Sequence, residues 1–337
     1  MAPNFTVELS DLRGWASQVG RGSEDLGAAH KYAAGDIADA DFGRVLEMIT
    51  GDYAAMLTKF HTILQADSTG LDQERAALNA SAAAYKAVDD RSGDHFSQLA
   101  GGGTLHTVDD GVANGFNDSS YAAAMLTPPS DGGVALPEVS FGWILDQVCD
   151  LIVWVGGPDP REYVTRWIVG DIGKAATQVS AWQHVADCVD AIDANLTAGK
   201  AAIAHTWTGS ASAAAVAQMD KWGTCLTDQS SKMRQMAGYL GDAVDQAVKM
   251  AQVVVDIIKE VISIVSAGLS SAAIPFYGQW KLIKTVKEAI TMVNSARKVI
   301  LVFWNFLIMV KSFIQLCIST FSADVLPPAP STAAVPG

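Results

Sequence analysis

Trp207-Thr208-Gly209 separates two long stretches of helical periodicity and decides the fold. Before this tripeptide, apolar residues recur every three or four positions from Ile172 to Ile203, and after it the same spacing resumes from Ala213 to Val248. Such spacing is typical of the buried face of an amphipathic helix. The sequence therefore predicts an all-α protein in which a tight turn joins two long antiparallel helices. A two-helix hairpin buries its apolar faces only against further helices, so we expect four-helix-bundle-like packing.

A second helical unit is predicted over residues 1–99. Its apolar stripes begin at Val7 and at Phe42, and the alanine-rich stretch from Leu71 to Val88 favours helix. Phe42-Gly43 lies between the two stripes and is interpreted as a shortened aromatic-x-Gly turn. Gly70 is expected to kink or end a helix.

The rest of the chain is divided by composition. Residues 100–138 lose the periodicity and contain Gly101-Gly102-Gly103 and Pro128-Pro129, which predicts a flexible linker. The hairpin domain then covers residues 139–250, with Asp171 as the expected N-cap of its first long helix. Residues 251–322 form a hydrophobic helical region, and the proline-containing residues 323–337 a disordered tail.

Charge and hydropathy are unevenly distributed. The 337-residue chain has 36 acidic and 23 basic residues, a formal net charge of -13, which makes binding to nucleic acid unlikely. The stretch from Val299 to Ser319 is apolar and about long enough to span a bilayer. Asn305, Lys311 and Gln315 count against a simple spanning helix. A helix that is buried or faces a partner and a helix that enters a membrane both remain open.

Four cysteines are present and do not match a zinc-binding spacing. Cys188 and Cys225 lie at nearly equal distances from Trp207, so an antiparallel hairpin brings them to a similar height. Two interpretations remain: a disulfide formed in an oxidising compartment, or two small buried thiols.

The helix–Trp-x-Gly–helix hairpin resembles that of the WXG family, the small ESAT-like proteins exported by the type VII (ESX) pathway. Residues 160–250 are similar to the larger actinobacterial members, in which the hairpin is one part of a long chain. Tyr85-Lys86-Ala87-Val88-Asp89 resembles the Tyr-x-x-x-Asp/Glu export signal of type VII substrates. Residues i and i+4 share one helix face, so a translocating ATPase could read Tyr85 and Asp89 together; the alternative is an ordinary surface pair.

The resemblance implies a protein that is cytoplasmic before export and then secreted or held in the cell envelope. Met1 to Thr6 has no basic region followed by an apolar run, so no ordinary signal peptide is expected. The implied partners are the type VII secretion ATPase and either a small WXG-type protein or, by intramolecular pairing, the chain's own N-terminal unit. The alternatives are a cytoplasmic chaperone or structural protein for a hydrophobic partner, and a membrane-inserting, pore-like effector.

The sequence does not predict an enzyme. Its six histidines do not form a His-x-x-x-His or His-Glu-x-x-His pattern, and Gly-x-Ser-x-Gly does not occur. The glycine run of the linker is not followed by Gly-Lys-Ser/Thr, so it is not a phosphate-binding loop. We therefore expect no catalytic residues, metal or cofactor, and a function in protein–protein or membrane contacts.

Overall fold

The computed structural model describes residues 6–99, 111–137, 142–154, 156–161, 170–271, 277–322 and 325–330. These residues are mostly helical, and the described part contains no strand, so the predicted all-α class is confirmed. The elements in chain order are α1 (Leu9–Asp36), η1 (Arg44–Leu46), α2 (Glu47–Leu99), η2 (Ala122–Met125), α3 (Gly142–Trp154), α5 (Ile172–Ile203), α6 (Ser210–Ser271) and α7 (Tyr277–Thr320).

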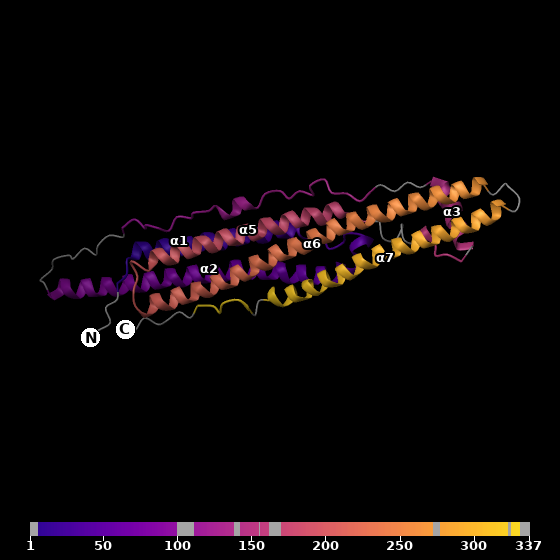
Figure 1. Ribbon diagram of the computed structural model, residues 1–337. Helices are drawn as coiled ribbons and strands as arrows, with labels where there is room; N and C mark the ends of the chain where they lie inside the picture. Colours follow the sequence, from indigo (N-terminus) through magenta and orange to yellow (C-terminus); the bar gives the residue numbers. More distant parts are fainter. Residues whose placement is uncertain are drawn as a thin grey trace.

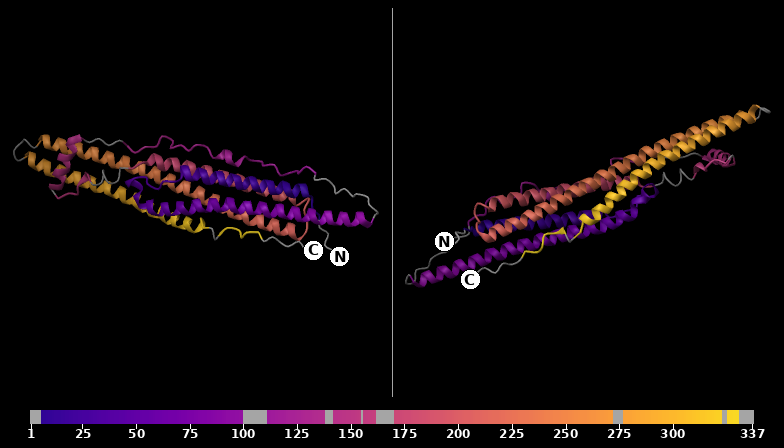
Figure 2. Two further views of the ribbon diagram at one scale, coloured as in Figure 1. Left: turned by 180° about the vertical axis from the view of Figure 1, so that it is seen from behind. Right: turned by 60° about the horizontal axis from the view of Figure 1, so that its bottom comes forward.

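The helices form a long bundle (Figure 1). The α1–α2 hairpin packs against the α5–α6 hairpin mainly through α1 and α5. The four helices lie side by side along the long axis of the molecule. Helix α7 then returns along α6 and contacts α2 with its C-terminal part. Beyond the ends of α1, α2 and α5, helices α6 and α7 continue as a two-helix projection, with α3 beside it (Figure 2).

One continuous core joins the two predicted helical units. Buried side chains of α1, α2, α5, α6 and α7 belong to a single cluster. Its largest members include Trp15, Tyr53, Trp182 and Trp222, which come from both halves of the chain. A smaller cluster lies in the projection between α3, α6 and α7. The predicted boundary at residue 250 falls inside α6, so the hydrophobic region continues from the hairpin domain without a break.

The turn between α1 and α2 contains Phe42 and Gly43, where the sequence placed the N-terminal aromatic–glycine turn. Phe42 is fully buried, and Gly43 adopts a φ of 78°, which favours glycine. The Phe42 carbonyl accepts a hydrogen bond from the Asp171 amide (3.1 Å). Asp171 in turn caps α5, because its side chain accepts a bond from the Lys174 amide (3.0 Å), as predicted.

The predicted flexible linker is wrong for residues 111–137. This segment runs along the outside of α1 and α5 and is held by polar contacts (Figure 1). Asn195 of α5 accepts hydrogen bonds from the amides of Ser119 (3.0 Å) and Ser120 (3.2 Å), and Arg21 of α1 pairs with Asp118. Side chains far away in the sequence therefore order a segment that has no periodicity of its own. Residues 100–110 and 138 lie outside the described residues.

Gly70 neither kinks nor ends a helix, because α2 runs through it. A Cβ atom built on Gly70 would lie 2.5 Å from Cη2 of Trp222. The missing side chain thus makes room for the indole of α6, whose N–H group donates to Glu74 one turn further along α2 (3.1 Å). Glycine here leaves room for a large side chain that reaches from α6 to α2, and it does not break the helix.

Cys188 and Cys225 are both free thiols, so the possible disulfide is not formed. Cys188 and Cys225 are nearly the same number of residues from Trp207, but they do not lie at the same height because α5 and α6 are offset along the bundle axis. Asp187 pairs with Arg234 (2.7 Å), and Arg234 is nine positions beyond Cys225, about 13 Å along the helix axis. Burial raises the pKa of each thiol to about 12. Both cysteines are therefore protonated thiols within the helical packing.

The C-terminal part of the chain is anchored to the bundle. On α7, Lys311 pairs with Asp52 of α2 (3.1 Å), and Gln315 donates to the same carboxylate (2.8 Å). Past α7, the Pro328 carbonyl accepts a bond from Gln218 of α6 (2.7 Å). The predicted disordered tail is therefore wrong for residues 325–330; residues 323–324 and 331–337 lie outside the described residues.

Candidate functional site

The Trp207 turn closes one end of the bundle. Helix α5 ends at Ile203, whose carbonyl accepts the Trp207 amide (2.9 Å), and α6 begins at Ser210. Gly209 has a φ of 107°, a conformation that L side chains rarely adopt, so glycine is required at this position. The Ser212 hydroxyl donates to the Trp207 carbonyl (2.8 Å) and fixes the first turn of α6.

The start of the chain pairs with this turn. Val7 and Trp207 form an isolated antiparallel bridge, in which the Glu8 amide donates to Thr206 (3.0 Å) and the Thr208 amide donates to Thr6 (2.9 Å). No pattern in the sequence indicates this contact, because two residues of extended backbone have no periodicity. The bridge fastens the beginning of α1 to the turn between α5 and α6.

The Trp207 side chain is buried among aromatic residues of the N-terminal unit. It is 2% exposed and meets Trp15 edge to face, with ring centroids 6.2 Å apart. Tyr85 of α2 packs against it from another side, with ring centroids 6.3 Å apart and an interplanar angle of 84°. The Trp207 indole N–H donates a long hydrogen bond to the Tyr85 hydroxyl (3.4 Å). The turn and the first residue of the Tyr-x-x-x-Asp motif therefore meet in one chain.

Asp89 lies one helical turn beyond Tyr85 and is exposed. Helix α2 continues past the Trp207 turn and projects from this end of the bundle (Figure 1). Thr208 and Gly209 are exposed as well, whereas Tyr85 is half-buried. At this end of the bundle the half-buried Tyr85 packs against the buried Trp207, and Asp89, Thr208 and Gly209 are exposed residues beside this contact in the two motifs. We call this region the Trp207–Tyr85 end.

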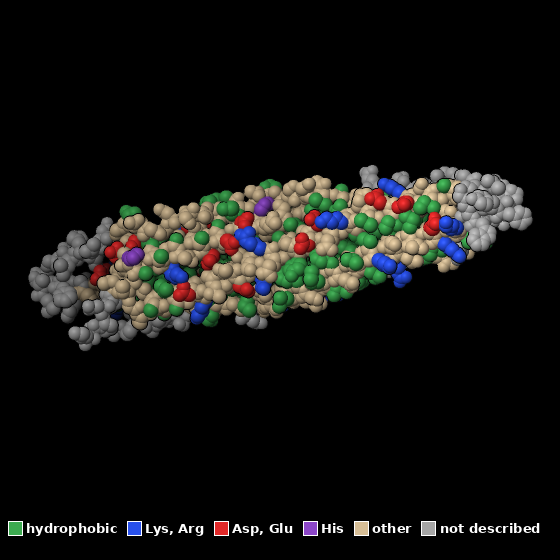
Figure 3. Space-filling view, viewed as in Figure 1, with side chains coloured by type: hydrophobic (Ala, Val, Ile, Leu, Met, Phe, Trp, Pro, Cys, Tyr) green, Lys and Arg blue, Asp and Glu red, His purple; other side chains and the backbone are tan. Residues whose placement is uncertain are grey.

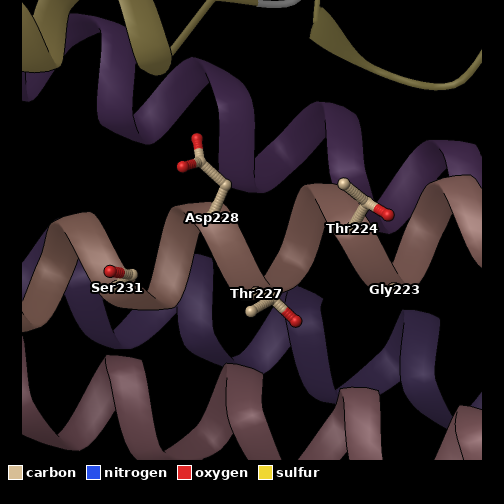
Figure 4. A pocket seen from close by; sticks show the side chains of 5 residues that line it. All are labelled: Gly223, Thr224, Thr227, Asp228 and Ser231. Atoms are coloured by element: carbon tan, nitrogen blue, oxygen red, sulfur yellow. The ribbon is translucent and has the colours of Figure 1, made fainter.

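An open hollow lies on the outer side of α6, lined by Gly223, Thr224, Thr227, Asp228 and Ser231 (Figure 4). All five residues belong to one helix, and in the close-up Asp228 and Thr227 point to opposite sides. The Thr227 hydroxyl donates a hydrogen bond to the Asp193 carboxylate of α5 (3.3 Å). Small hydroxyls on one open helix face do not form a pocket that encloses a ligand.

The chemistry available at the Trp207–Tyr85 end is that of recognition. Within the described residues, no group of three His, Cys, Asp or Glu side chains could hold a metal ion. His205, next to the turn, is exposed. What the site offers is two aromatic rings held in place, the exposed carboxylate of Asp89 and the exposed turn residues Thr208 and Gly209.

Comparisons with protein families, with characterised proteins and with solved structures gave no match to this chain.

Proposed function

We propose that this chain is a non-enzymatic substrate of type VII secretion, a secreted or cell-envelope helical protein that acts through contacts with other macromolecules. One observation carries the proposal: the Trp207 indole, in the hairpin turn that resembles the WXG motif, contacts Tyr85 of the sequence that resembles the export signal. The two motifs are 122 residues apart in the chain. Their contact gives a secretion ATPase one composite surface to bind.

The physical roles of the residues follow from their burial. Trp207 and Tyr85 hold the α5–α6 turn against α2, so the exposed Asp89 has a fixed position relative to Thr208 and Gly209. Binding to a preorganised surface avoids the entropy cost of ordering it. Pairing of the two halves within one chain takes the place of a separate small partner protein, which the shared core supports.

Export into the culture filtrate tests the proposal. We expect the Asp89→Ala variant to be retained in the cell, because Asp89 is exposed and its loss removes the carboxylate without disturbing the core. The matched control is Asp90→Ala, which removes the neighbouring exposed carboxylate that pairs with Lys86 (3.2 Å). Tyr85→Phe keeps the ring and removes the hydroxyl, and is expected to be exported less than the wild type.

Two results would contradict the proposal. If the wild-type protein remains inside cells that have an active type VII system, it is not a substrate of that system. Equal export of the Asp89→Ala and Asp90→Ala variants would exclude Asp89 as part of the signal. Circular dichroism of each purified variant establishes that the fold is kept.

A further inference from the structure

Helix α7 has one buried face and one exposed face. The side chains of Phe303, Leu307, Val310 and Ile314 are buried against the bundle. On the opposite side an apolar row is open to solvent, with exposed fractions between 47% and 68% for Leu301, Val302, Ile308, Met309 and Leu316. Trp304 at its edge is 36% exposed. The exposed Asn305 and Ser312 lie between these side chains on the same helix face, so the face is mixed but rich in large apolar side chains. Exposed apolar patches rimmed by polar residues are typical of interaction surfaces.

Basic side chains continue the same face toward the start of α7. Lys287, Arg297 and Lys298 share the helical face of Leu301 and Met309. All three are exposed, and the nearest acid in the helix, Glu288, is the only one between Tyr277 and Thr320. In the view of Figure 3, hydrophobic side chains gather over α7 near the middle of the molecule, and Lys and Arg side chains lie farther toward the α6–α7 end.

These basic groups have no partners within the described part of the chain. No described carboxylate lies within 4.0 Å of Lys284, Lys287, Arg297 or Lys298, although the chain has a net charge of -13. Lys311, which points inward from α7, is paired with Asp52. Among the described residues of this acidic protein, Lys284, Lys287, Arg297 and Lys298 have no carboxylate partner, and they lie on the helix that also carries the exposed apolar side chains.

We propose that this face of α7, from Lys284 to Leu316, binds the surface of an anionic lipid membrane. Lys and Arg side chains contact anionic headgroups, while the row around Ile308 enters the boundary between headgroups and acyl chains. A partly exposed tryptophan such as Trp304 is typical of this interface. The inference is independent of the export proposal, because it depends on α7 alone.

The geometry favours a helix that lies on the membrane over one that crosses it. Residues Ile283–Thr320 are long and apolar enough to cross a bilayer, but one third of the most apolar window is already buried in the protein. Crossing would also break the contacts of Lys311 and Gln315 with Asp52. The acidic residues elsewhere act weakly on the contact, because charges more than about 8 Å from the membrane are screened at physiological ionic strength.

Flotation of the full-length protein with lipid vesicles tests the inference. We expect binding to vesicles of phosphatidylcholine with phosphatidylglycerol and none to phosphatidylcholine alone. The charge-reversed triple variant Lys287→Glu/Arg297→Glu/Lys298→Glu should bind at least about a hundredfold less. The control triple Lys31→Glu/Lys59→Glu/Lys221→Glu makes the same change in net charge at exposed lysines of α1, α2 and α6, and should keep wild-type binding.

The apolar row is tested separately by Ile308→Ser/Met309→Ser, which should also lower binding about tenfold while leaving the helix content unchanged, since both side chains are exposed. Absence of wild-type binding to anionic vesicles, or equal loss in the α7 and control triples, overturns the proposal. A concentration-dependent dimer that Ile308→Ser/Met309→Ser abolishes, without vesicle binding, would assign the face to a second copy of the chain and overturn the lipid proposal.

Discussion

Asp67 is a carboxyl group in the middle of α2 that lies fully inside the bundle. Among the described residues, its one hydrogen-bond partner is the amide of Gln229 on α6, whose Nε2 donates to Asp67 Oδ1 (3.2 Å). Asp67 Oδ2 and Gln229 Oε1 are both buried without a partner. A proton on Oδ2 makes the carboxyl a donor, and the unused amide oxygen of Gln229 is an acceptor in the same pair. Burial accordingly raises the pKa of Asp67 to about 7.

The pKa of Asp67 predicts that stability falls as pH rises. Between about pH 4 and pH 7 the unfolded chain has lost this proton while the folded chain keeps it, so the free energy of unfolding decreases across this window. Asp67→Asn keeps the shape and supplies a permanent donor. We expect this variant to be the more stable protein at pH 8, by up to about 4 kcal/mol, with a much smaller difference at pH 4.

Urea unfolding of both proteins from pH 4 to pH 8 measures this effect. The informative quantity is the difference between variant and wild type, since Asp25 and Asp193, whose pKa values burial also raises, are common to both. A difference that stays constant with pH would show that Asp67 does not titrate in this range.

At the scale of the helices, the sequence predicted well what depends on local spacing. Apolar residues three or four positions apart identified the long helices around Trp207, and Asp171 was recognised as a cap because capping is a local interaction. Order in residues 111–137 depends on Asn195 and Arg21, which are distant in sequence, so composition alone indicated a flexible linker. The prediction of a kink or helix end at Gly70 is wrong for the same reason, because its partner Trp222 lies on another helix.

Two glycines of α2 give a direct test of this interpretation. Gly70→Ala places a Cβ atom 2.5 Å from the buried Trp222 ring, which its hydrogen bond to Glu74 holds in place. We expect a loss of about 1–3 kcal/mol in the free energy of unfolding from overpacking. Gly51→Ala, in the same helix with nothing within 4 Å of its new Cβ, should gain about 0.5–1 kcal/mol through helix propensity.

Thermal unfolding of the two variants and the wild type shows whether packing against Trp222 or helix propensity determines the effect of replacing each glycine. Opposite shifts in Tm are expected. If both variants are stabilised, the Trp222 ring moves aside at little cost and the close contact at Gly70 does not determine the packing of α2 against α6.

At the scale of the whole molecule, the sequence suggested the two helical units but left two arrangements open. Each hairpin could pair with a separate small protein, or the two hairpins could pair with each other. Which surfaces match depends on three-dimensional complementarity, such as the meeting of Trp207 with Trp15 and Tyr85, which no local pattern encodes. In the structure, side chains of both units fill the same interior, which supports pairing of the two hairpins within one chain.

A chain cut between the two units should therefore stay together. We expect that cleavage at a protease site introduced within residues 100–110 leaves residues on both sides associated, with the mass of the intact 35.5 kDa chain in light scattering. In the uncut chain, the linker contributes only by keeping the two halves at a high effective concentration, and this contribution is lost on cleavage. The Tm of the cut protein should accordingly rise with protein concentration, whereas that of the uncut protein should not. If the halves separate into two folded species, the shared core does not hold the units together, and separate partner proteins become the better explanation for their apolar faces.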